Sequence, residues 1–126
     1  MRTTPTPEGR VKKKIKAVLD AHNIFHFSPN MNGYSGKAGI PDIIACVRGH
    51  LVSIEVKADA KKPPSKLQMR RMSEIRQSGG LTLLVHDGNF NEFKNLVQEM
   101  ATTPSVWETV WASDLYYREQ WNDNVA

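Results

Sequence analysis

Apolar residues along the chain recur with two different spacings, and these spacings predict one order of helices and strands. Helices are expected over about 8–22, from Ser65 to Gly79 and from Asn89 or Asn91 onward, and strands over 24–27, 42–47, 51–57 and 81–86. The predicted order is therefore helix, three strands, helix, strand, helix, and no internal repeat interrupts it.

The central strands differ in pattern. The strand over 42–47 is apolar on both parities after Asp42, as expected of a strand covered on both faces. It contains Cys46, which is predicted to be a small buried hydrophobe rather than a reactive thiol. The strand over 51–57 instead alternates between apolar and polar residues. The strand over 81–86 is mostly apolar and is predicted to be central in the sheet.

A short turn between the strands over 42–47 and 51–57 predicts a hairpin. The pairing of its two strands decides whether Asp42, Glu55 and Lys57 lie close together. Opposed residues of an antiparallel pair have a constant sum of residue numbers and share a face. A two-residue turn gives a sum of 97 or 99 and sets Asp42 opposite Glu55 or Lys57, whereas a regular three-residue turn separates them. Gly49 favours the two-residue turn, or a three-residue loop with a bulge that also shifts the pairing. We therefore expect Asp42, Glu55 and Lys57 to share one face.

Two adjacent carboxylates repel one another unless a positive charge lies between them. Oxygen ligands suit a hard divalent ion such as Mg²⁺ or Mn²⁺, and a lysine beside it could orient a water or stabilise charge on a phosphate. The alternative is that Ser53, Glu55 and Lys57 form the solvated face of an amphipathic strand, with Asp42 as an ordinary strand-start residue.

The composition, 40% hydrophobic and 24% charged over 126 residues, is typical of a single globular domain. Residues 1–80 hold 15 Lys or Arg against 6 Asp or Glu, and residues 81–126 hold 2 against 7, so the two segments carry +9 and −5. A basic segment indicates a polyanionic partner, with nucleic acid as the first candidate. The alternative is that the lysines only solvate the first helix.

Other classes of protein are disfavoured. The longest apolar run is five residues, far short of the roughly 20 that a membrane span needs, and no signal segment follows the basic N-terminus. With a single cysteine, the chain is expected in the reducing cytoplasm. The four histidines lack zinc-ligand spacing. The segment over 30–39 is predicted to be a loop with three glycines, called here the glycine loop. It is not a nucleotide-binding P-loop because Ala38 stands where Ser or Thr is needed, so no nucleotide cofactor is expected.

The sequences Ile40-Pro41-Asp42 and Ile54-Glu55-Val56-Lys57, within this order of elements, resemble the PD-(D/E)xK nuclease superfamily. The resemblance spans about 8–98 and is nearest to the VRR-NUC branch, small stand-alone members of which are phage-encoded. Glu8, Gly39 and Gln68 fall where that branch carries such residues. The resemblance implies an α/β, restriction-endonuclease-like core, with a mixed central sheet flanked by helices in the order α-β-β-β-α-β-α.

The resemblance also implies roles. Asp42, Glu55 and the backbone carbonyl of Val56 would ligate Mg²⁺ or Mn²⁺, and Lys57 would be the catalytic lysine. Glu8 would complete the acidic cluster, directly or through a metal-bound water, and Gln68 would hold the site or the substrate strand. The implied reaction is metal-assisted hydrolysis of a DNA phosphodiester.

Several of these residues have a simpler explanation. Glu8 could be a favourable anion in the first turn of a helix, and Gln68 an ordinary surface residue. Ser35 and Lys37 in the glycine loop could contact DNA phosphates or only solvate the loop. The expected DNA contacts on the first helix are Lys12, Lys13 and Lys16.

The segment 102–126 is an aromatic, acidic tail to a nuclease core of about 8–100 within one domain of 1–126. Its tryptophans could cover the core, pack against a second copy or stack on unpaired bases. Stand-alone members of the branch tend to be homodimers acting on branched DNA such as four-way (Holliday) junctions. We therefore hypothesise a structure-specific DNA endonuclease. The alternatives are a nicking or end-processing nuclease without junction preference, and a non-catalytic basic DNA-binding module.

Overall fold

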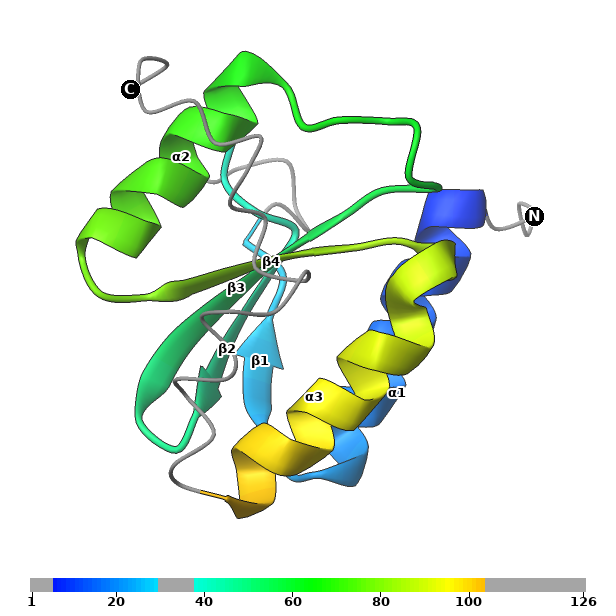
Figure 1. The fold of residues 1–126 in the computed structure, drawn as a ribbon, viewed down its shortest axis with the longest axis vertical. Coiled ribbons are helices and arrows are strands. Elements are labelled where there is room, and N and C mark those ends of the chain that lie inside the picture. The colour runs from blue at the N-terminus through cyan, green and yellow to red at the C-terminus, as the bar shows by residue number, and fades with distance from the viewer. Residues whose placement is uncertain (1–5, 30–37, 104–126) are drawn as a thin grey trace.

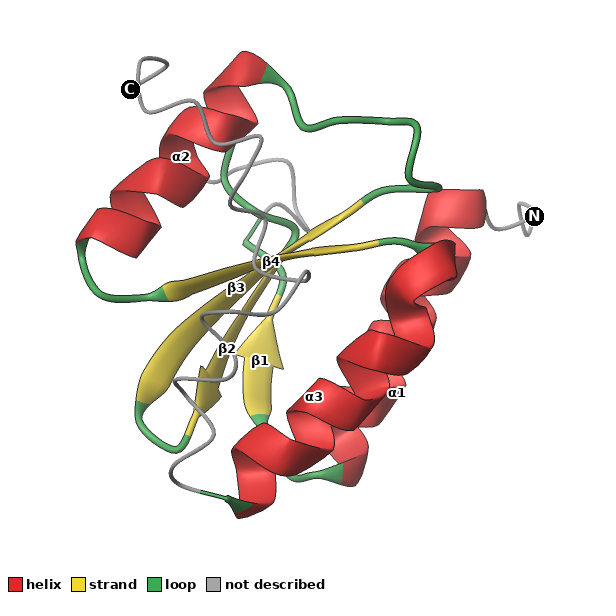
Figure 2. Cartoon of the chain, viewed as in Figure 1, coloured by secondary structure: helices red, strands yellow, loops and turns green. Residues whose placement is uncertain are grey.

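The computed structural model describes residues 6–29 and 38–103. They form helices α1 (Pro7–Ala21), α2 (Lys66–Gln77) and α3 (Phe90–Thr102), strands β1 (Phe25–Phe27), β2 (Ile43–Val47), β3 (His50–Val56) and β4 (Leu81–Val85), and a 3-10 turn η1 (Asp87–Asn89). The order α-β-β-β-α-β-α confirms the order predicted from the apolar pattern (Figure 2). No helix in these two ranges is both long enough and apolar enough to cross a lipid bilayer.

The described strands form one mixed sheet in the order β1-β2-β3-β4, antiparallel from β1 to β3 and parallel between β3 and β4. Helices α1 and α3 pack together on one face, and α2 lies on the other (Figure 1). The prediction that β4 is central was wrong for the described sheet, in which it is an edge strand. Its apolar composition arises because Leu81, Leu83 and Val85 are buried on one face and Thr82 on the other.

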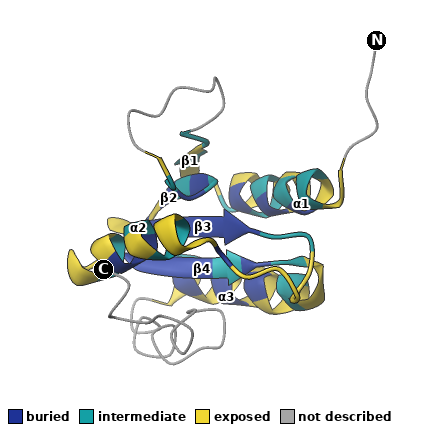
Figure 3. Cartoon of the chain, turned by 90° about the horizontal axis from the view of Figure 1, so that it is seen from above, coloured by how far each residue is buried: buried dark blue, intermediate teal, exposed yellow. Residues whose placement is uncertain are grey.

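The main hydrophobic core lies between α1, α3 and the sheet face that they cover (Figure 3). Alternate residues of β2 and β3 point into it, including Ile43 and Ile54, which have no exposed surface. The helices contribute buried residues at helical spacing: Val11, Ile15 and Leu19 from α1, and Phe93, Leu96, Val97 and Met100 from α3. The two periodicities read from the sequence therefore meet in one core.

The opposite sheet face is covered unevenly. Helix α2 contacts β4, and Ser53, Glu55 and Thr82 are buried on this side. Over β1 and β2, by contrast, Phe25 and Cys46 are exposed. In the part of the chain that the structure describes, the predictions that the strand over 42–47 is covered on both faces and that Cys46 is buried were therefore wrong. Their physical reason is that, among the described elements, only the 12-residue α2 lies on this face, and it packs toward β4.

The β2–β3 hairpin has a two-residue turn, one of the two turns that Gly49 favoured. Val47 pairs with His50, and both turn residues have positive φ, 49° at Arg48 and 86° at Gly49, as in a type I′ turn. Ile43 pairs with Ile54, so opposed residue numbers sum to 97. The next step of this register sets Asp42 opposite Glu55.

Helix α2 is fixed at its N-terminus by a capping box, in which Ser65 Oγ accepts from the Gln68 N–H and the Gln68 side chain accepts from the Ser65 N–H. The segment before β2 packs against this end of the helix. Gly39 has φ +80°, and a Cβ there would lie 2.7 Å from Leu67 Cγ and 3.0 Å from the Leu67 carbonyl oxygen. Arg71 Nε also donates to the Ala38 carbonyl at 2.9 Å.

Replacement of Gly39 by Ala tests this close approach, and Gly49→Ala is its matched control. Both glycines have similar positive φ, but nothing lies within 4 Å of a Cβ at Gly49. We expect Gly49→Ala to lower the free energy of unfolding by about 1–2 kcal/mol through backbone strain. Gly39→Ala should cost at least about 1 kcal/mol more, because the helix must also move. Urea unfolding of both variants measures the difference, and equal losses would contradict the packing described.

Candidate active site

Asp42, Glu55 and Lys57 meet at the end of the sheet where β2 begins and β3 ends. Asp42 Oδ2 accepts a hydrogen bond from the Val56 N–H at 2.8 Å. Lys57 Nζ lies 3.6 Å from Glu55 Oε2, and the Glu55 side chain is 2% exposed. The predicted convergence of these three residues is what the register of the hairpin produces.

Gln68 joins the cluster from α2 and binds two charged residues, Glu55 on β3 and Lys57 directly after this strand. Its Nε2 donates to Glu55 Oε2 at 2.7 Å, and its Oε1 accepts from Lys57 Nζ at 3.0 Å. The same Oε1 accepts from the Ser65 N–H at 2.8 Å, which completes the capping box. Gln68 is therefore held between the helix end and the charged cluster, rather than being an ordinary surface residue.

Glu55 is the most perturbed group of the cluster. The pKa of its carboxyl is raised from 4.5 to about 8. Burial is the largest cause, the negative charge of Asp42 acts in the same direction, and the ammonium of Lys57 opposes the shift. Glu55 Oε1 is buried and has no hydrogen-bond partner. A buried acceptor of this kind destabilises the protein unless a proton or a cation satisfies it.

Lys12 of α1 approaches the cluster from its outer side. Its Nζ lies 3.1 Å from Asp42 Oδ1 and 3.6 Å from Glu8 Oε2. Partial burial lowers the pKa of Lys12, but the carboxylates of Asp42 and Glu8 outweigh this effect, so the pKa lies above 10.5. Lys12, expected from the sequence as a DNA contact, is thus also a counter-ion to Asp42. The i,i+4 spacing was a signal for its pairing with Glu8, but nothing in the sequence indicated the pairing with Asp42.

Glu8 lies in the first turn of α1, which Thr6 caps by accepting from the Gly9 N–H at 2.9 Å. Its side chain is 40% exposed, and Lys12 lies between it and Asp42. Across residues 6–29 and 38–103, no three His, Cys, Asp or Glu side chains are grouped closely enough to hold a metal by themselves. A direct role of Glu8 as a third ligand therefore finds no support in its position.

The donors nevertheless suit a hard divalent cation. Two carboxylates, Asp42 and Glu55, lie close enough for one charge to raise the pKa of the other, and one oxygen of the pair has no partner. Oxygen donors with excess negative charge are what Mg²⁺ and Mn²⁺ bind. These residues fit a metal that is held by two carboxylates and backbone or water oxygens.

The remaining expected DNA contacts divide into two groups. On α1, Lys13 is exposed and Lys16 is half-buried. The neighbouring Lys14 instead pairs with Asp87 at 3.2 Å and lies 4.4 Å from the Phe90 ring centroid. Ser35 and Lys37 lie outside the described residues. The cluster therefore borders the basic helix α1, and its relation to the glycine loop stays a prediction.

Comparison with solved structures finds a chain described as a "VRR_NUC domain". The match has a TM-score of 0.63 and 29% sequence identity, and it covers 74% of this chain and 96% of that chain. No family model and no curated protein sequence matches. Since the match spans nearly all of the other domain and most of this chain, the restriction-endonuclease-like fold is confirmed. In fold, the chain is therefore similar to a VRR-NUC domain, which supports the resemblance to the VRR-NUC branch found in its sequence motifs.

Proposed function

We propose that the protein is a Mg²⁺- or Mn²⁺-dependent DNA endonuclease whose active site consists of Asp42, Glu55, Lys57 and Gln68. The observation that carries the proposal is the buried Glu55 carboxyl beside Asp42, with one oxygen unpaired and the other held by Gln68. A cluster that only stabilised the fold would be expected to satisfy this oxygen within the protein. In a nuclease, a bound cation would satisfy the unpaired Glu55 oxygen, and the substrate phosphate would bind beside that cation.

Asp42, Glu55 and the Val56 carbonyl are the proposed metal-binding groups, with Glu8 acting at most through a water. A bound divalent ion would lower the pKa of a water and neutralise charge on the scissile phosphate. The chain itself supplies the ammonium of Lys57, which Gln68 holds at 3.0 Å. In that position Lys57 can orient the attacking water or stabilise negative charge on the phosphate.

The substrate side of the proposal rests on charge. The net +9 of residues 1–80 surrounds the proposed site in sequence, and Lys13 and Lys16 lie on the same helix as Lys12. Basic surface there would offset repulsion between the acidic cluster and a DNA backbone. We propose branched DNA, such as a four-way junction, as the preferred substrate. A homodimer would present two such sites to two strands.

Loss of cleavage with retained binding is the expected effect of Lys57→Ala and Asp42→Asn. Each should reduce metal-dependent cleavage by about 10²-fold or more, because each removes a group that acts on the phosphate or its metal. Labelled single strand, duplex, flap, fork and four-way junction are incubated with Mg²⁺ or Mn²⁺, and binding is followed by fluorescence anisotropy. Lys61→Ala, in the exposed loop before α2, is the control and should cleave normally.

A non-catalytic DNA-binding module would bind this panel and cleave none of it with either metal, which would reject the nuclease. Equal cleavage of all five substrates would reject only the junction preference and favour the nicking or end-processing alternative.

Glu55→Gln should change how the metal-free protein responds to pH. The folded protein keeps the Glu55 proton up to pH about 8, whereas the unfolded chain releases it near 4.5, so stability should fall as the pH rises between these values. The substituted amide cannot ionise, so the variant should unfold at a higher temperature than the natural protein at pH 8.5 in EDTA. Adding Mn²⁺ should stabilise the natural protein more than the variant. Glu99→Gln, on the exposed side of α3, should leave both responses unchanged.

Lys12→Met should strengthen metal binding, because the ammonium of Lys12 and a metal ion would compete for Asp42. An ion pair at this degree of exposure contributes about 1 kcal/mol or less, so a gain in Mn²⁺ affinity of up to about fivefold is expected by titration calorimetry. The exposed Lys13→Met removes the same charge one residue away and should change the affinity less. Equal effects of the two variants would mean that Lys12 acts only through net charge.

A further inference from the structure

The sheet face that carries the proposed active site continues into an uncovered apolar surface. Residues paired across the strands share a face, and on this face Phe27 is paired with Ile44, and Phe25 with Cys46. Cys46 is in turn paired with Leu51 on β3. These five residues form two apolar rows across the strands, one of Phe27 and Ile44 and one of Phe25, Cys46 and Leu51. Both rows lie on the same sheet face as Asp42 and Glu55.

Their exposure is unusual for this chain. Phe25 is 70% exposed, Phe27 49% and Leu51 46%, whereas the core residues on the other face are at most 8% exposed. The two phenyl rings also contact one another, with centroids 6.1 Å apart. A contiguous apolar surface with aromatic side chains is typical of an interaction site rather than of a solvated face.

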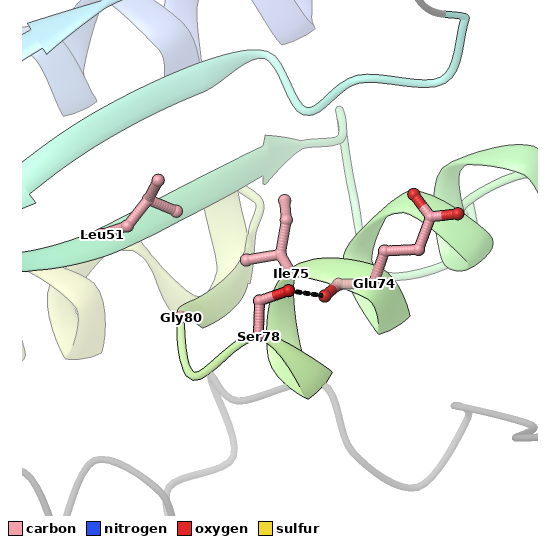
Figure 4. Close-up of a pocket in the computed structure, with 5 residues that line it drawn as sticks. All are labelled: Leu51, Glu74, Ile75, Ser78 and Gly80. Carbon is pink, nitrogen blue, oxygen red and sulfur yellow. Dashed lines mark hydrogen bonds between the residues drawn. The ribbon is translucent and has the colours of Figure 1, made fainter.

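Two hollows run along this surface and meet at Leu51. One, of about 210 Å³, is lined by Phe25, Phe27, Ile44, Ala45, Cys46, Gly49 and Leu51. The other, of about 240 Å³, lies between Leu51 and the end of α2, where Ile75 and Gly80 form its wall (Figure 4). Ser78 Oγ there is bound to the Glu74 carbonyl at 2.9 Å. We name the two hollows together the Leu51 groove.

We propose that the Leu51 groove is the docking site of this chain's own C-terminal segment, residues 104–126. This segment holds all three tryptophans of the protein, Trp107, Trp111 and Trp121, together with Tyr116 and Tyr117. The apolar groove matches such side chains, which bury large areas when they dock. The proposal does not depend on nuclease activity.

The position and length of the segment fit this assignment. Helix α3 ends at Thr102, at the same end of the sheet as the β2–β3 hairpin and the start of β1 (Figure 1). Phe25, Cys46 and Leu51 lie at that end. The 23 residues after Thr103 can span up to roughly 75 Å when extended, more than enough to pass around a sheet edge to the opposite face.

The lining residues of the groove include no basic side chain, which argues against DNA as the occupant. Residues 104–126 hold four acidic residues and one Arg, a net −3, and the groove lining contains one charged side chain, Glu74. A groove for unpaired bases would need basic side chains along its length to hold the backbone. If a second copy of the protein filled the groove, the tryptophans of residues 104–126 would have no role in filling it.

The chain carries two probes for the test. All tryptophan fluorescence comes from the proposed segment, and the single thiol, Cys46, lies in the groove. In the full-length protein we expect tryptophan emission to be blue-shifted relative to the urea-unfolded chain. We also expect Cys46 to react with a thiol reagent at least about tenfold more slowly than in Phe25→Asp or Leu51→Asp, whose new charge repels the segment. Both variants should shift the emission to the red.

Gln98→Asp, which adds the same charge on the exposed side of α3, should change neither signal, and circular dichroism verifies that each variant is folded. Two results would overturn the proposal: fast Cys46 reaction in the natural protein, or emission that Phe25→Asp and Leu51→Asp leave unchanged in folded protein. Protection that disappears on dilution would show that a second copy covers the groove. Protection that appears only with single-stranded DNA would show that bases do.

Discussion

The pairing of β2 with β3 through a two-residue turn is the constraint on which the rest of this structure depends. Arg48 and Gly49 adopt the positive φ angles that such a turn requires, and this fixes the number sum of opposed residues at 97. A sum of 98 would turn Asp42 to the face of Val56, into the core between the sheet and helices α1 and α3. The register therefore decides both where the acidic pair lies and which apolar residues reach the core.

Given that register, the protein must accommodate a carboxyl group where there is almost no water. Glu55 is 2% exposed, and its neutral form is favoured by burial and by the charge of Asp42. Gln68 and Lys57 compensate one of its oxygens and leave the other without a partner. The fold tolerates this because the surrounding positions of β2 and β3 are apolar and closely packed. The buried Glu55 carboxyl lowers the stability of the fold, and the same carboxyl strongly attracts a positive charge.

Much of this could be predicted from the sequence. Helices and strands followed from periodicity, and the shared face of Asp42 and Glu55 followed from the parity of a short turn. Local sequence could not reveal lateral neighbours. It did not show that β4 is an edge strand of the described sheet, because apolar residues indicate which faces of a strand are covered and not which strands are hydrogen-bonded to it. Cys46 was misjudged for the related reason that how far α2 reaches over the sheet depends on tertiary packing. The contact of Lys12 with Asp42 likewise joins segments far apart in sequence.

The double use of Gln68 has one more consequence. A single amide oxygen accepts from the Ser65 N–H that starts α2 and from the ammonium of Lys57, so the helix end and the charged cluster share one hydrogen-bond acceptor. Opening of the first helical turn would therefore release Lys57, and any ligand that orders Lys57 would slow that opening. The first turn of α2 is thus thermodynamically coupled to whatever binds at the end of the sheet, and amide hydrogen exchange at this turn becomes a reporter of occupancy.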